Sequence, residues 1–128
     1  MTRKALVALF LIAALAGCSD QSNGGAATGS AQNTADGITK AAYNDDYAGV
    51  SANFDDAVKR TVGRAEVGAM SDKMHKLGDY TGLTLLASNP AKNEFTYRAA
   101  FSHGTMNVGL RLDPDGKVAA YRIFLPAQ

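Results

Sequence analysis

The chain has 128 residues with 13 basic and 12 acidic side chains, and its formal net charge is +1 at pH 7. A balance this close to neutral supplies no strong field for recruiting nucleic acid or an anionic lipid surface. The single cysteine excludes an internal disulfide as a source of stability.

The amino end has the pattern of an export signal. Arg3 and Lys4 provide a positive start, and residues 5–16 are uncharged and rich in Ala, Leu, Val, Ile and Phe. As a helix this run would rise only about 18 Å against a hydrocarbon core of roughly 30 Å, which is too short for a permanent anchor. The pattern therefore predicts a signal peptide over residues 1–17.

The residues that end this segment, Leu15-Ala16-Gly17-Cys18, resemble the lipobox of bacterial lipoproteins. The resemblance implies that the sulfur of Cys18 receives diacylglycerol, that cleavage falls after Gly17, and that the new amine is acylated. Two or more acyl chains bind a membrane stably, so the mature chain would be anchored by lipid at Cys18. The alternatives are an ordinary secretory signal with a chance cysteine, or an uncleaved anchor.

The residue after the cysteine bears on location. Ser19 stands where an aspartate would favour inner-membrane retention in many Gram-negative bacteria, so in such a host we expect the outer membrane, facing the periplasm; Asp20 argues weakly against this. Removing Arg3 and Lys4 from the 13 basic residues leaves 11 against 12 acidic residues, a formal charge of −1. We therefore expect the membrane as a partner through the lipid, and no nucleic acid.

Residues 18–35 are expected to form the acylated cysteine and a disordered tether. From Ser19 to Ala35 there is no large apolar residue, and Gly, Ser, Ala, Asn, Gln and Thr predominate. Such a segment buries too little surface to offset the entropy of ordering it. A root-mean-square reach of about 20–25 Å would lift the domain clear of the lipid headgroups.

Residues 36–128 suffice for one small domain, and the first half has apolar residues at helical spacings. We expect a short helix that ends near Asn44, and a second helix that Asp45 or Asp46 caps. Gly63 should break the second helix, and Gly78 should close a third in the left-handed conformation. The three apolar stripes are Ile38, Ala41 and Ala42; Tyr47, Val50, Phe54, Ala57 and Val58; and Val67, Met70, Met74 and Leu77.

From Asp79 the apolar period changes to two, which predicts strands over residues 80–87, 95–102, 106–112 and 118–125. The expected turns are Ser88-Asn89-Pro90, His103-Gly104 and Asp113-Pro114-Asp115-Gly116. One face of this meander is apolar and the other mixed, as in an antiparallel sheet covered by helices on one side.

Several segments carry a family resemblance: Asn44-Asp45-Asp46-Tyr47, the stretch 54–59, Leu77-Gly78-Asp79-Tyr80, Phe101-Ser102-His103-Gly104 and the stretch 115–119. Together they are similar to a bacterial family of unknown function in the nuclear-transport-factor-like, or cystatin-like, superfamily. The resemblance spans nearly all of residues 36–126, although a tryptophan often seen in the third helix is absent. It implies an α+β domain with N-terminal helices packed on one face of a curved four-stranded antiparallel sheet, but no particular reaction.

No residue stands out as catalytic, and no metal or cofactor is predicted. His75 at the edge of a helical stripe and His103 in a turn are most simply solvated. The acidic residues fall at helix ends and turns, where capping explains them. The turn over residues 113–116 resembles a calcium loop only faintly, because it lacks the further acidic ligands.

Arg98 and Arg111 are candidate ligand-binding residues. They share the polar face of neighbouring strands if the His103-Gly104 loop has two residues, a register that pairs Arg98 with Gly109. Arg122 joins them only if the last hairpin has an even register, since a bulge at Gly116 would turn it to the other face. Such arginines can hold a carboxylate or phosphate; a solvated strand face is the alternative.

Tyr97 and Tyr121 complete the candidate binding set, as two of five tyrosines that exceed what the core needs for volume. Tyrosines with one wet end often line clefts or partner surfaces, and the alternative is a place at the edge of the core. We thus predict a periplasm-facing binding or assembly module, with an envelope protein or small ligand as partner. The alternative is a small isomerase-like or hydrolase-like enzyme with an ionisable side chain deep in a pocket of the cone-shaped fold.

Overall fold

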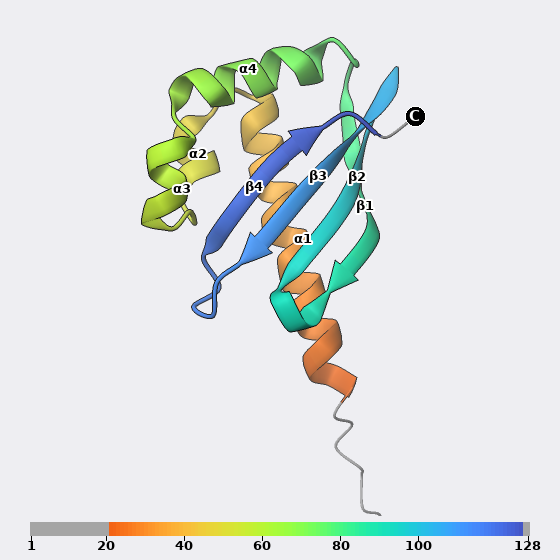
Figure 1. Cartoon of the computed structure of the whole chain (residues 1–128). Coiled ribbons are helices and arrows are strands. Elements are labelled where there is room, and N and C mark those ends of the chain that lie inside the picture. The colour runs from red at the N-terminus through yellow and green to blue at the C-terminus, as the bar shows by residue number, and fades with distance from the viewer. Residues whose placement is uncertain (1–20, 127–128) are drawn as a thin grey trace, which may run out of the picture.

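The computed structural model describes residues 21–126 as helices followed by an antiparallel sheet (Figure 1). The strands pair in the order β1-β2-β3-β4 and the sheet does not close, which confirms the predicted α+β class with a curved four-stranded sheet. The elements are α1 (Gln21–Tyr43), α2 (Tyr47–Ser51), α3 (Asp56–Thr61), α4 (Arg64–His75), β1 (Tyr80–Asn89), the 3₁₀ turn η1 (Pro90–Lys92), β2 (Glu94–Phe101), β3 (Gly104–Leu112) and β4 (Val118–Phe124).

Helix α1 crosses one face of the sheet, and the core lies between the two (Figure 1). Helices α2 and α4 pack on α1, while α3 lies beside β4. The opposite side of the sheet, here called the outer face, is covered by none of the described helices (Figure 1). The buried apolar residues from the helices are Ala31, Ala35, Ile38, Ala42, Val50, Phe54, Val58, Val67 and Met74; those from the strands are Phe95, Tyr97, Ala99, Phe101, Met106, Val108, Leu110, Val118 and Tyr121.

Helix α1 corrects the boundary expected at residue 36. The segment predicted as a disordered tether is helical from Gln21, and Ala31 and Ala35 are fully buried against the sheet. The prediction was wrong because it rested on the absence of large apolar residues from this segment. A helix that lies close to a sheet can instead bury a narrow stripe of alanines, here continued by Ile38 and Ala42 at spacings of three and four. The signal peptide and Cys18 lie outside the described residues.

The single helix expected from Tyr47 to Val62 is in fact two, α2 and α3. Asp46 caps α2 by accepting a hydrogen bond from the amide of Gly49 at 3.1 Å. Asp55 caps α3 in the same way, accepting from Val58 at 2.9 Å. Between the helices the backbone pairs with the start of β4, because the amide of Asp55 donates to the carbonyl of Val118 at 2.9 Å. A stripe at spacings of three and four cannot distinguish one helix from two that share a buried side.

The turn after α4 follows the prediction. Gly78 has φ +91°, a left-handed conformation, and a Cβ there would collide with the side chains of Ser102 and His103. The central hairpin differs by one residue from the expected His103-Gly104 turn, since Phe101 pairs with Gly104 and the loop is Ser102-His103. This turn is held to the end of α4, because the amide of His103 donates to the carbonyl of Leu77 at 2.8 Å.

The last hairpin settles where Arg122 points. Leu112 pairs with Val118 but Arg111 pairs with Ala120, so Ala119 is an extra residue on β4. Beyond that irregularity Tyr121 faces the core, and Arg122 lies opposite Gly109 on the outer face. Arg122 therefore joins Arg111 on the same side of the sheet.

Candidate functional site

The outer face is built from alternate residues of β2, β3 and β4. On β2 and β3 every second side chain is buried toward α1, so the intervening ones point away from it. Cross-strand pairing places Thr96, Gly109 and Arg122 in one row across the three strands. The rows on either side of it are Glu94, Arg111 and Ala120, and Arg98, Asn107 and Phe124.

Three exposed arginines and one carboxylate supply the charge of this face. Arg98, Arg111 and Arg122 come from three neighbouring strands, and Glu94 lies directly opposite Arg111. Within residues 29–126 the ion pair that the structure shows is elsewhere, on α1, so the three guanidinium groups are not committed to a carboxylate. Arg122 lies over the ring of Phe124, with its Cζ atom 4.9 Å from the ring centroid.

A depression of about 490 Å³ lies over two of these rows, the row of Thr96, Gly109 and Arg122 and the row of Glu94, Arg111 and Ala120. Gly109 forms part of its floor, and a Cβ at that position would lie 3.2 Å from Nε of Arg122. Glycine thus leaves room for the arginine to lie across β3. Val58 and Val62, from α3 and the residue after it, contribute to the wall next to β4, and Arg111 also borders the depression. The arrangement can receive an extended group that presents carboxylates or phosphates to the arginines.

The structure brings together only half of the predicted binding set. Arg98 and Arg111 share the outer face as expected, although Arg98 pairs with Asn107 rather than Gly109. Tyr97 and Tyr121 lie on the other side of the sheet, in the core. The sequence pattern leaves the facing of Arg122 open, and it contains no signal that Gly109 forms the floor of a depression.

The two core tyrosines are held in their protonated form. Burial raises the pKa of Tyr97 to about 12 and moves the pKa of Tyr121 further above its usual range. The hydroxyl of Tyr121 lies 2.8 Å from Oγ1 of Thr39, which itself donates to the carbonyl of Ala35 at 2.7 Å. The hydroxyl of Tyr97 has no hydrogen-bond partner among the described residues. Neither hydroxyl reaches the outer face.

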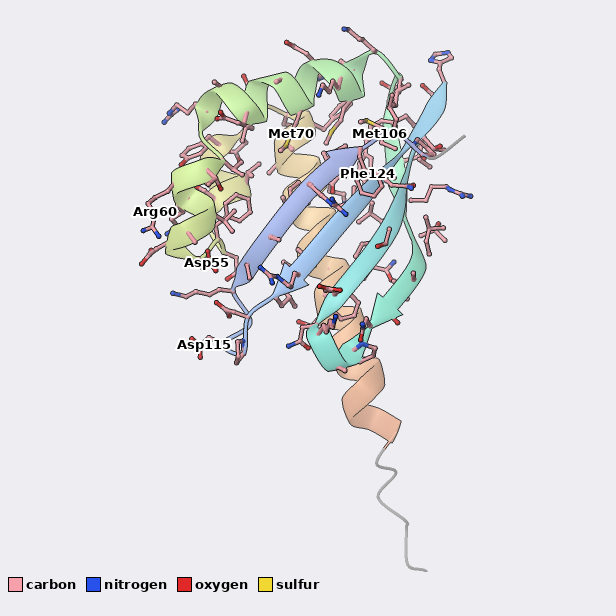
Figure 2. The ribbon with its side chains drawn as sticks, viewed as in Figure 1. Asp55, Arg60, Met70, Met106, Asp115 and Phe124 are labelled. Atoms are coloured by element: carbon pink, nitrogen blue, oxygen red, sulfur yellow. The ribbon has the colours of Figure 1, made fainter. Side chains whose placement is uncertain are left out.

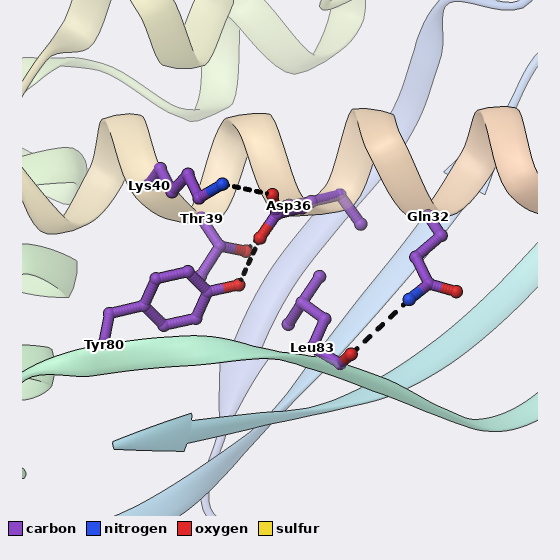
Figure 3. Close-up of polar contacts among 7 residues, drawn as sticks. Gln32, Asp36, Thr39, Lys40, Tyr80 and Leu83 are labelled. Atoms are coloured by element: carbon purple, nitrogen blue, oxygen red, sulfur yellow. Dashed lines mark hydrogen bonds and ion pairs between the residues drawn. The ribbon is translucent and has the colours of Figure 1, made fainter. Parts of the chain in front are cut away.

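A polar contact joins α1 to the edge strand β1 (Figure 3). The hydroxyl of Tyr80 donates to Oδ1 of Asp36 at 2.7 Å, and Nζ of Lys40 lies 2.6 Å from Oδ2 of the same carboxylate. Partial burial acts to raise the pKa of Asp36, but Lys40 and Tyr80 outweigh it, and the net pKa is lowered. Gln32 adds a weaker contact to the carbonyl of Leu83 at 3.4 Å. Both contacts fasten the helix to the sheet.

The two histidines and the acidic turn over residues 113–116 make contacts within the fold. The ring of His75 lies against the ring of Tyr43 in a tilted arrangement, with centroids 4.1 Å apart, and Nδ1 of His103 in the two-residue turn lies 3.2 Å from Oγ of Ser102. Oδ1 of Asp113 accepts from the amides of the following turn at 2.9 and 3.0 Å. In the described part of the chain no group of three His, Cys, Asp or Glu side chains is placed to hold a metal ion.

The interior bears on the enzyme alternative, which needs an ionisable side chain deep in a pocket. Within residues 29–126, the buried polar side chains are Thr39 and Ser71, besides the two tyrosines. Ser71 donates to the carbonyl of Tyr43 at 2.9 Å. No observation in this part of the chain favours a particular reaction.

Comparisons with models of protein families, with curated proteins and with solved structures found no match. Over residues 21–126, none of the helices combines the length and the apolar character needed to cross a membrane.

Proposed function

We propose that this protein is a lipid-anchored module of the bacterial envelope that binds an acidic segment of another envelope protein on the outer face of its sheet. The binding proposal is supported by three arginines that lie on strands not covered by any described helix. The anchor is supported by the sequence, in which the only cysteine follows a short apolar run at Leu15-Ala16-Gly17. With Ser19 after it, the module would face the periplasm from the outer membrane of a two-membrane host.

Charge favours an acidic partner. The mature chain would have 11 basic and 12 acidic residues, whereas the described part of the outer face has three arginines and one glutamate. Positive charge is therefore concentrated where the sheet is uncovered. Guanidinium groups bind carboxylates in a bidentate geometry, and complementary charge speeds the encounter of two proteins.

The size of the face favours a short segment over a broad surface. Four strands spaced about 4.8 Å apart and about eight residues long give a face of roughly 15 by 25 Å. This area of about 400 Å² is half of what one partner contributes to an interface of standard size. The complex should accordingly be weak, and it should weaken further with salt because the arginines are exposed.

A titration monitored by amide NMR signals tests the binding proposal. Protein comprising residues 19–128 is titrated with a hexaglutamate peptide, and with hexalysine as the control. We expect hexaglutamate to shift the signals of Thr96, Gly109 and Arg122 and their row neighbours, with an effect that fades at high salt. Hexalysine should shift none of them.

Two triple variants make the test specific. Arg98→Gln, Arg111→Gln and Arg122→Gln together should abolish the shifts, because they remove the charge of the outer face. The matched control replaces Lys59, Arg60 and Arg64 with glutamine, and Arg60 points away from the sheet (Figure 2). Equal losses from the two triples, or shifts spread over the whole domain, would contradict docking on this face.

A further inference from the structure

A second depression, of about 300 Å³, lies where the C-terminal end of α4 meets one end of β3 and β4. Its apolar wall comprises Leu77, Met106, Ile123, Phe124 and Leu125. Met106 and Phe124 are seen at this end of the sheet in Figure 2. Leu125 is 71% exposed, so the groove leaves a large aliphatic side chain in water. Contact with an apolar ligand would remove that surface from water, which is favourable.

Among the residues that the structure describes, the charged ones that line this groove are two lysines. Lys73 lies in the last turn of α4, and Lys76 follows three residues later. Both are exposed, and in the part of the chain described with side chains neither forms an ion pair. Lysines at a helix C-terminus also favour the helix dipole, so they do not define a site by themselves. Beside an apolar trough they make it complementary to a molecule with an apolar chain and an anionic head.

The dimensions of the groove suit a single chain. A volume of about 300 Å³ lies at the lower end of the range for small-molecule sites. Such a space is too small for a folded segment with its own side chains, but it fits part of one acyl chain. Since none of the described residues that line the groove is acidic, their side chains would not repel a carboxylate head group placed at Lys73 and Lys76.

The position of the groove favours the binding of a single amphiphile over contact with a bilayer surface. The groove lies at the end of the molecule opposite to the start of α1 (Figure 1). Helix α1 has 23 residues and is about 35 Å long. With the anchor proposed at Cys18, just before this helix, the groove is displaced from the anchored end by about that length. This step rests on the proposed anchor, whereas the chemistry of the groove does not.

We propose that this groove binds one fatty acid molecule, with its acyl chain against Leu77, Met106 and Phe124 and its carboxylate between Lys73 and Lys76. Decanoate, kept below its micelle concentration, is the probe. Calorimetry should show saturable one-to-one binding, and the amide signals of Leu77, Met106 and Ile123 should shift. Decyltrimethylammonium has the same chain with the opposite head charge, and it should bind at least tenfold more weakly.

Charge variants test the assignment of the head group. Lys73→Glu with Lys76→Glu should weaken decanoate binding at least tenfold and should strengthen binding of decyltrimethylammonium. Leu125→Gln should weaken both probes alike, because it removes apolar contact only. The control Lys92→Glu, at the other end of the sheet, should leave both affinities unchanged. If the double reversal destabilises α4, Lys73→Gln with Lys76→Gln should still lower the preference for decanoate.

Three results would overturn the proposal. One is the absence of saturable decanoate binding to the folded wild-type protein. Another is unchanged decanoate affinity in a folded variant that lacks both lysine charges. The third is binding to phosphatidylglycerol vesicles without binding to decanoate, which would make the groove a membrane contact. None of these results involves the outer-face arginines, so failure here is distinguishable from failure of the proposed function.

Discussion

The two tyrosines buried in the core differ in the surroundings of one atom. The hydroxyl of Tyr121 lies within hydrogen-bond distance of Thr39, whereas the hydroxyl of Tyr97 has no partner among the described residues. A buried hydrogen bond stabilises a protein by about 1 kcal/mol, and an unpartnered buried hydroxyl costs free energy. The pair therefore offers matched substitutions that delete the same oxygen.

Tyr121→Phe should lower the free energy of unfolding by about 1–2 kcal/mol, because it leaves Thr39 without its second hydrogen bond. Tyr97→Phe should leave the free energy of unfolding unchanged or raise it by up to about 1 kcal/mol. Urea unfolding of the two variants and the wild type at neutral pH measures both changes. Equal destabilisation by the two substitutions would mean that the hydroxyl of Tyr97 has a partner in solution.

The sequence predicts the side of the sheet on which a side chain lies wherever the odd or even position along the strand decides it alone. Moving the central turn from His103-Gly104 to Ser102-His103 changes the register by two residues, so Arg98 and Arg111 stay on one face either way. The facing of Arg122 depends on whether β4 carries an extra residue. The sequence offered Gly116 as the place for it, but the irregularity falls at Ala119, within the strand. Residue patterns do not encode that choice strongly.

Among the helices and strands, α1 differs most from what the sequence pattern predicts. A polar, glycine-containing segment has little reason to form a helix alone, and helices in proteins gain most of their stability from packing. Here the sheet supplies the packing, which a single-sequence pattern does not reveal. The same holds for α2 and α3, whose separation depends on backbone bonds to β4, a strand distant in sequence.

Two aspartate substitutions test whether the helix belongs to the domain. Ala35→Asp would place a carboxylate at a fully buried position, and we expect a loss of at least 3 kcal/mol in the free energy of unfolding. Asn33→Asp, at an exposed position of the same helix, should change it by less than about 0.5 kcal/mol. Thermal or urea unfolding gives both values. If Ala35→Asp is as mild as Asn33→Asp, the segment is a tether after all.

For the whole molecule, the early start of α1 changes how the proposed anchor would present the domain. Only Ser19 and Asp20 lie between Cys18 and Gln21, where the helix begins. The three residue-to-residue steps from Cys18 to Gln21 can span at most about 11 Å, which is less than the 20–25 Å expected of a flexible tether. A lipidated Cys18 would therefore hold the base of the domain near the lipid headgroups, with α1 leading away from the anchor.

The proposed function depends most on that anchor, and intact-protein mass spectrometry tests for it directly. The full chain is expressed in a Gram-negative host, extracted from membranes in mild detergent, and compared with a Cys18→Ser variant. We expect a mature chain that begins at Cys18 and carries diacylglycerol and an amide-linked acyl group, and a variant that lacks both. An unacylated chain, or a variant that remains with the membranes at an unchanged mass, would contradict it.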